Sequence, residues 1–143
     1  MDGDGDGDVA VNAGVSRFGD GSSGVGGRHA FMLSFQKLDV YKCAIEFLAL
    51  AAQVSVDVPR GNAPILDQLK RAATSIPLNI AEAAGRTGQA DAARTYAIAR
   101  GSAMECAAVL DALLVLTVVE PETHQRGCEL LERIVAMLTR LCR

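Results

Sequence analysis

Residues 68–86 read QLKRAATSIPLNIAEAAGR, and this stretch decides the fold because it carries two opposite faces of one helix. The apolar face starts slightly upstream and recurs at steps of three and four residues: Leu66, Leu69, Ala73, Ile76, Ile80 and Ala83. The polar face has the same spacing: Gln68, Arg71, Ser75, Asn79, Glu82 and Arg86. This periodicity predicts an amphipathic α-helix whose apolar face packs against other helices.

The ends of this helix carry recognisable signals. Asn62 is a favourable N-cap, Pro64 suits the first turn, and Gly85 is placed to end the helix as the C′ glycine. Pro77 lies inside the helix, where it lacks an N–H donor and crowds the carbonyl group of Ala73. We therefore expect a kink at Pro77, offset by packing.

Three further segments have helical periodicity. The first is capped by Ser34 or Asp39 and ends before the turn-forming residues 57–62. Its core stripe is Val40, Ala44, Phe47, Ala51 and Val54, and a second stripe beside it is Tyr41, Ile45, Leu48 and Ala52. The third helix, capped by Thr87, spans residues 88–118, and the fourth begins at Pro121. Four helices joined by short loops predict an all-α, up-down-up-down antiparallel four-helix bundle over residues 34–143.

The third helix is unusually apolar. Between Ala103 and Val119 only Glu105, Asp111 and Thr117 are polar. A membrane span is disfavoured, because two carboxylates lie in this short run and no basic clusters flank it. We predict instead a helix buried between its own bundle and a neighbouring subunit.

The N-terminal residues 1–33 differ from the rest in composition. The chain has 17 acidic and 14 basic residues, of which five and two lie in residues 1–31, so the remainder holds 12 of each and is neutral. This Gly- and Asp-rich acidic tail predicts disorder. Asp2, Asp4 and Asp6 fit half of a calcium-binding loop, but its twelfth position is Ala13, so we expect a solvated tail. An alternative is that Met32 is the biological start.

The polar face of residues 68–86 has partners in the third helix. An antiparallel hairpin turning near residue 88 places Arg71 opposite Glu105 and Glu82 opposite Arg94. Ser75 is then level with Gly101 and Ser102, whose small size favours close approach of the helices. We predict an interhelical polar network of Gln68, Arg71, Ser75, Asn79, Glu82, Arg94, Ser102 and Glu105. The alternative is that part of this face lines a ligand or nucleic-acid site.

The residues 68–86 closely resemble the signature of the bacterial four-helix bundle proteins, also called 23S rRNA intervening-sequence proteins. Residues 35–41 (FQKLDVY) are similar to the usual opening of that family, and residues 98–105 (IARGSAME) are similar to its third-helix motif. The resemblance covers residues 34–142, with one departure: Ala83 stands where the family usually has Gly. It implies a short-looped bundle that assembles as a homopentamer and has no established enzymatic activity.

A related branch of the family comprises accessory proteins of diversity-generating retroelements, which look like basic pentameric barrels that bind nucleic acid and a reverse transcriptase. This resemblance implies a non-catalytic scaffold for RNA, DNA or a nucleic-acid enzyme. The candidate contacts are the basic residues outside the expected ion pairs: Arg60, Lys70, Arg86 and Arg100. The alternative is a protein-interaction module without nucleic acid, suggested by the apolar residues Val115, Val118, Val119 and Met137.

Signals for an enzyme are missing from the sequence. No Ser-His-Asp or Cys-His arrangement is spaced for a nucleophile, so we predict no catalytic residue and no cofactor. The chain has two histidines, His29 in the tail and His124, and no Glu-x-x-His pair, so we predict no metal site. The cysteines, Cys43, Cys106, Cys128 and Cys142, are far apart. They indicate a reduced compartment, which we expect to be the bacterial cytoplasm, with no membrane partner.

Overall fold

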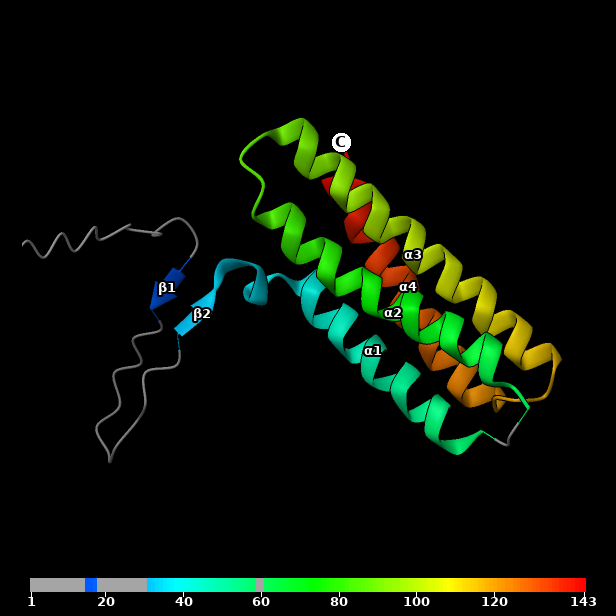
Figure 1. Cartoon of the computed structure of the whole chain (residues 1–143). Helices are drawn as coiled ribbons and strands as arrows, with labels where there is room; N and C mark the ends of the chain where they lie inside the picture. Colours follow the sequence, from blue (N-terminus) through cyan, green and yellow to red (C-terminus); the bar gives the residue numbers. More distant parts are fainter. Residues whose placement is uncertain (1–14, 18–30, 59–60) are drawn as a thin grey trace, which may run out of the picture.

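The four-helix prediction is confirmed in a computed structural model, which describes residues 15–17, 31–58 and 61–143 (Figure 1). The helices are α1 (Asp39–Asp57), α2 (Ala63–Ala84), α3 (Gln89–Val115) and α4 (Pro121–Leu141). A 3₁₀ turn, Ser34–Lys37, precedes α1. The bundle thus forms from the segments whose apolar residues recur with helical spacing.

The four helices form a square in cross-section. The α1 helix packs on α2 and α4, and α3 also packs on α2 and α4, with the α2–α3 contact the most extensive (Figure 1). The short connections make sequential helices antiparallel neighbours. As a consequence, α1 and α3 lie diagonally across the bundle, and their outer surfaces face different directions.

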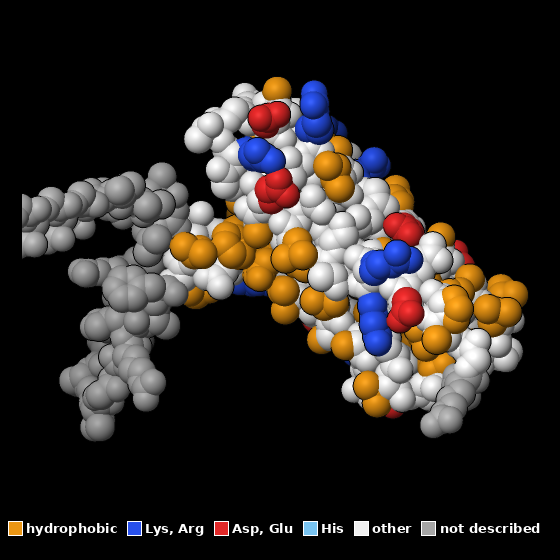
Figure 2. All heavy atoms as spheres, viewed as in Figure 1, with side chains coloured by type: hydrophobic (Ala, Val, Ile, Leu, Met, Phe, Trp, Pro, Cys, Tyr) orange, Lys and Arg blue, Asp and Glu red, His pale blue; other side chains and the backbone are white. Residues whose placement is uncertain are grey.

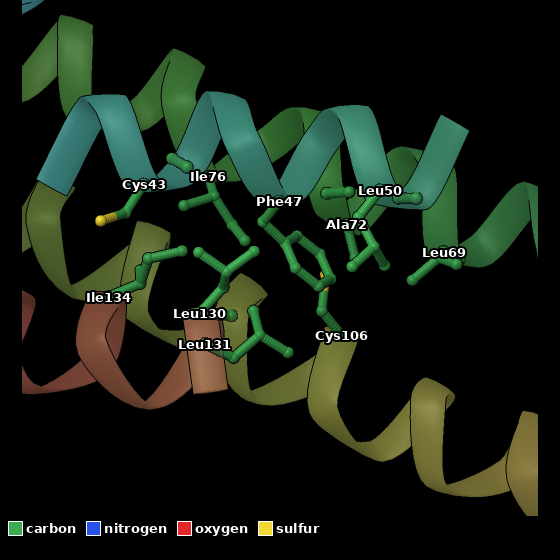
Figure 3. Close-up of a cluster of buried hydrophobic side chains, with 14 of the residues drawn as sticks. Cys43, Phe47, Leu50, Leu69, Ala72, Ile76, Cys106, Leu130, Leu131 and Ile134 are labelled. Atoms are coloured by element: carbon green, nitrogen blue, oxygen red, sulfur yellow. The ribbon is translucent and has the colours of Figure 1, made fainter. Parts of the chain in front are cut away.

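All four helices contribute to the core. The largest side chains that are fully buried are Phe47, Leu69, Ile76, Ile80, Cys106, Leu110, Leu113, Ile134 and Leu138. Figure 3 shows the Phe47 ring of α1 between the other helices, close to Cys106 of α3. Burying a side chain of this kind contributes about 1.5–3 kcal/mol, so this layer holds the bundle together.

Glycine at one position allows α4 to approach the core closely. Gly127 is buried, and a Cβ atom built on it would lie 2.6 Å from Cδ1 of Leu110. The same atom would lie 3.6 Å from side-chain atoms of Leu50 and Phe47. No side chain larger than hydrogen fits there without displacing Leu110.

Two of the predicted N-caps were wrong. The α1 helix is preceded by Leu38 rather than capped by Ser34 or Asp39, because the 3₁₀ turn has already redirected the chain: the Leu38 N–H donates to the Phe35 carbonyl. Asp39 instead lies in the first turn, where its negative charge interacts favourably with the helix dipole and stabilises the helix. At α3 the N-cap is Gly88, one residue after Thr87, because the backbone is still extended there.

Of the remaining predictions about helix ends, some are confirmed and one was wrong. Asn62 occupies the N-cap of α2, Pro64 lies in its first turn, and Pro121 begins α4, as predicted. Gly85 ends α2, but its φ of −86° is right-handed, so the expected left-handed C′ glycine was wrong. Pro77 is buried within one continuous helix, and the kink there stays a prediction.

Most of the predicted tail, including Asp2, Asp4 and Asp6, lies outside the described residues. Within it, β1 (Val15–Arg17) pairs antiparallel with β2 (Phe31–Leu33), and Val15 lies opposite Leu33 (Figure 1). This two-stranded pairing precedes the helical bundle in the chain. The sequence did not indicate it, because a three-residue strand is too short to show an alternating pattern.

Candidate functional site

A hydrogen-bonded seam joins α2 and α3. The Ser75 and Ser102 hydroxyl oxygens are 2.8 Å apart, across the two helices. Asn79 Nδ2 donates to the Ser75 carbonyl oxygen at 2.8 Å and to Ser75 Oγ at 2.9 Å. All three side chains are half-buried. The facing of Ser75 and Ser102 is as the hairpin arithmetic predicted, and these neutral groups fix the register of the two helices.

The predicted ion pair between Arg71 and Glu105 was wrong. Glu105 Oε1 accepts a hydrogen bond from Gln68 Nε2 at 3.2 Å, one turn earlier on α2. Arg71 is exposed and takes part in no ion pair among the described residues. A hydrated guanidinium avoids the desolvation cost of a buried pair, so Arg71 remains available at the surface.

The predicted pair between Glu82 and Arg94 was also wrong. Glu82, in the last turn of α2, pairs at 2.5 Å with Arg86, which follows the end of that helix. A local i,i+4 pair needs no second helix to be held in place, which explains why it forms instead. Arg94 is exposed on α3, and within the part of the chain that the structure describes it forms no ion pair. The predicted network therefore separates into a neutral seam and surface charges.

Gly101 does not bring α2 and α3 together, contrary to the prediction. It is exposed, and a Cβ atom built on it has no neighbour within 4 Å. It belongs to a small-residue apolar strip on the outside of α3, which we call the α3 outer face: Ala97, Gly101, Met104, Ala108 and Val115. Met104 is 49% exposed and Val115 is 81% exposed. In a single chain α3 is therefore uncovered on this face, and its burial against a neighbouring subunit stays a prediction.

A second apolar strip lies on α1. The α1 outer face consists of Ile45, Leu48, Ala49, Ala52 and Val56. Leu48 is half-buried and the others are exposed, Val56 to 78%. Figure 2 shows hydrophobic side chains along the α1 edge and at the end of the bundle where α3 finishes, with charged side chains between them. The α1 outer face includes most of the second stripe predicted beside the core stripe: Tyr41 and Leu48 are half-buried, and Ile45 and Ala52 are exposed.

Other apolar residues singled out from the sequence are less exposed. Val119 is buried, and Val118 and Met137 are half-buried. Of the four apolar residues that suggested an interaction surface, Val115 alone is exposed. Among the four helices, most of the exposed large apolar side chains lie on α1 and α3, although Leu78 of α2 is also exposed.

The four candidate nucleic-acid contacts have different surroundings. Arg60 lies outside the described residues. Arg86 pairs with Glu82, and half-buried Arg100 donates from Nε to Thr139 Oγ1 at 2.9 Å, which ties α3 to α4. Lys70 is exposed, and no ion pair within the described ranges includes it.

Lys70 and its neighbour Arg71 line two shallow surface hollows on α2. One hollow, of about 610 Å³, is also lined by Pro64 and Asp67. The other, of about 550 Å³, runs along the polar face of α2 past Ser75 and Asn79. Lys70 and Arg71 are the two basic residues of α2, whereas Arg86, which follows the helix, is paired with Glu82.

All four cysteines are free thiols. Cys43 and Cys106 are buried, whereas Cys128 and Cys142 are half-buried. Burial, with a smaller contribution from the Glu105 carboxylate, raises the pKa of Cys106 to about 12. Cys106 is therefore a packing residue with an inert thiol. In the part of the chain that the structure describes, no helix combines the length and the apolar character needed to cross a bilayer.

The fold and the seam define a class of protein, the short-looped antiparallel four-helix bundle. A family model described as 23S rRNA-intervening sequence protein matches residues 36–140. The chain belongs to this family. No curated protein matches the sequence.

A solved structure shares the fold. It is a crystal structure of a protein with unknown function from the S23 ribosomal protein family of Bacteroides thetaiotaomicron VPI-5482. The TM-score is 0.68 at 22% identity, over 73% of this chain and 98% of that one. This likeness supports the bundle architecture and carries no functional assignment.

Proposed function

We propose that the chain is a non-catalytic scaffold that assembles into a closed homopentameric ring and presents basic side chains to nucleic acid. The observation that carries this proposal is the pair of exposed apolar faces on α1 and α3. Isolated exposed apolar residues are ordinary, but strips of this kind mark interaction surfaces.

The position of the two faces favours a ring over a twofold dimer. In a twofold dimer, the same patch of each copy meets itself, so one of the two faces would stay exposed. In a head-to-tail contact, the α1 outer face of one copy covers the α3 outer face of the next, and closure of the ring covers both. The diagonal placement of α1 and α3 suits such a contact. Five copies is the number that the family resemblance implies.

The α3 outer face also has the composition of a close helix contact. Ala97, Gly101 and Ala108 leave its centre nearly flat, and Met104 supplies a flexible apolar side chain that adapts to a partner. The space above Gly101 is open in the single chain. A neighbouring helix can therefore approach α3 closely at this point.

Assembly also gives a neutral subunit a route to nucleic acid. Residues 32–143 carry equal numbers of acidic and basic residues. A single copy therefore has no overall positive charge to attract nucleic acid, and its proposed contacts are two adjacent cations on α2, Lys70 and Arg71. A ring repeats this pair around its axis, and repeated phosphate contacts add in free energy. The proposed ligand contact is therefore electrostatic and strongly dependent on salt.

Light scattering on a size-exclusion column tests the assembly. For a chain of 15.0 kDa, we expect about 75 kDa for five copies. Three matched substitutions of exposed alanines locate the contact: Ala52→Arg on α1, Ala108→Arg on α3 and Ala136→Arg on α4. The first two are expected to give monomers, and Ala136→Arg, outside both faces, to keep the ring. A monomeric unmodified protein would refute the proposal.

A titration with fluorescently labelled single-stranded RNA tests the second part. The affinity of the unmodified protein is expected to fall steeply from low to moderate salt. The double variant Lys70→Ala/Arg71→Ala should bind more weakly, and its salt slope should fall by about 0.7 for each phosphate that the protein no longer neutralises. The charge-matched control is Arg133→Ala/Arg140→Ala on exposed positions of α4. An equal reduction in affinity in both double variants would contradict a specific role for Lys70 and Arg71.

A further inference from the structure

Three metal-ligating side chains converge beside the α3–α4 turn. His124 Nε2 lies 2.7 Å from Asp111 Oδ1 and 3.5 Å from Cys128 Sγ. The three ligand atoms all lie within 4.8 Å of one another. His124 and Cys128 are four residues apart on α4, so they share a face, and Asp111 reaches them from α3.

We propose that Asp111, His124 and Cys128 form a binding site for a divalent transition-metal ion of the zinc class. From the sequence we predicted no metal site, because the chain has only two histidines and no Glu-x-x-His pair. In the structure, a carboxylate (Asp111) and a thiol (Cys128) lie beside His124, so three ligands are available to one ion. This proposal does not depend on the proposed assembly or on nucleic-acid binding.

One of the two nitrogen–ligand distances already fits tetrahedral coordination, and the other needs a small adjustment. With metal–ligand distances near 2.0–2.3 Å, pairs of tetrahedral ligand atoms stand about 3.3–3.6 Å apart. The nitrogen–sulfur distance of 3.5 Å already has this value. The nitrogen–oxygen distance of 2.7 Å is that of a hydrogen bond. The ion replaces this bond when the imidazole proton moves to Nδ1, so His124 ligates through Nε2 as a neutral ring. The Asp111 oxygen then has to withdraw by about 0.6 Å to reach the ligand separation of that geometry.

The different exposures of the three side chains suit this adjustment. The His124 side chain is 21% exposed and Cys128 is half-buried, so packing holds both in place. The Asp111 side chain is 71% exposed, so it can change rotamer without disturbing the core. Three protein ligands leave the fourth position of a tetrahedral ion to water.

The donor set selects the class of metal. Imidazole and thiolate are ligands for zinc and cobalt rather than for calcium or magnesium, which prefer oxygen. The local field also favours a cation. The Asp111 and Glu132 carboxylates both act on Cys128 electrostatically, and their negative charge attracts a divalent ion. On binding, the ion displaces the thiol proton to solvent and takes the thiolate as its ligand.

A bound ion would connect α3 to α4 close to the turn between them. It would thereby hold the end of the bundle where Val115, four residues after Asp111, belongs to the α3 outer face. The expected role is structural, and it has a thermal readout: an ion that binds the folded chain alone raises the melting temperature.

The test is a titration of the full chain, freed of metal with a chelator, with cobalt(II) followed by absorbance. We expect one cobalt ion per chain, a thiolate-to-cobalt charge-transfer band, and loss of that band when zinc is added. Cys128→Ser should abolish the band, and Asp111→Asn should weaken binding about tenfold or more, as loss of even an outer-shell partner does. Cys142→Ser, at the other end of α4, is the matched cysteine control and should keep the band.

Thermal melts by circular dichroism separate a lost ligand from a lost fold. Without metal, Cys128→Ser and the unmodified chain should melt cooperatively as helical proteins. Zinc should raise the melting temperature of the unmodified chain and of Cys142→Ser, but not that of Cys128→Ser. No charge-transfer band at tenfold excess cobalt, or an equal band in Cys128→Ser, would overturn the proposal.

Discussion

The best-defined prediction concerns two glycines within helices, Gly101 of α3 and Gly127 of α4. Gly127→Ala adds a methyl group 2.6 Å from Cδ1 of fully buried Leu110, whereas Gly101→Ala adds one with no neighbour within 4 Å. Both changes gain about 1 kcal/mol of helix propensity. Overpacking a core site costs about 1–3 kcal/mol.

Because both variants gain the same helix propensity, this gain cancels in the difference between their free energies of unfolding. The free energy of unfolding of Gly127→Ala should therefore be lower than that of Gly101→Ala by about 1–3 kcal/mol. The assay is urea denaturation followed by circular dichroism, with both changes made in the Ala108→Arg background so that assembly does not contribute. Equal stabilisation by both changes would show that Leu110 moves aside freely and that the α3–α4 contact is loose.

Three further predictions follow from the seam, the surface charges and the thiols. Ser75→Ala removes the hydroxyl group that Asn79 and Ser102 both contact, so the free energy of unfolding, measured by urea denaturation, should fall by about 1–2 kcal/mol. Ser75→Thr keeps a hydroxyl group and should recover part of this loss. Arg71→Ala should change the free energy of unfolding by less than about 0.5 kcal/mol, because the side chain is exposed. A loss of several kcal/mol would instead indicate that Arg71 forms a buried ion pair with Glu105. Cys106, with a pKa of about 12, should resist alkylation in the native protein up to pH 9 and react in urea. Mass spectrometry after labelling at pH 8 checks this, and rapid native labelling would contradict it.

The pH dependence of stability from Cys106 has a definite sign. Its pKa is raised from the ordinary value of 9.0 to about 12 in the folded chain, so the unfolded chain loses the thiol proton first. The contribution of this thiol to stability is complete below pH 9 and is lost as the pH rises toward 12.

The sequence predicted the helices because each buries one stripe of apolar residues, and periodicity reports burial directly. It also predicted that Ser75 faces Ser102, since an antiparallel hairpin leaves little freedom in register. It failed on the ion pairs. Long charged side chains choose among several partners at little cost, as Glu82 does with Arg86, and periodicity does not rank those choices.

The candidate surfaces were harder to predict for a different reason. The stripe Ile45–Leu48–Ala52 on α1 has the same composition as a core stripe, and only the packed bundle shows that no helix of the same chain covers it. The Asp111–His124–Cys128 cluster was missed because one ligand comes from another helix. The spacing of His124 and Cys128 by four residues was the available signal.

The central claim, a head-to-tail contact between the α1 and α3 outer faces, is tested most directly by mixing two variants. Ala52→Arg blocks the α1 face and Ala108→Arg blocks the α3 face, so each alone should be a monomer of about 15 kDa. A mixture retains one intact α3 face and one intact α1 face. Light scattering of the mixture should therefore show a heterodimer of about 30 kDa that neither variant forms alone. A mixture that stays monomeric, or an Ala52→Arg variant that keeps the mass of the unmodified protein, would contradict the account.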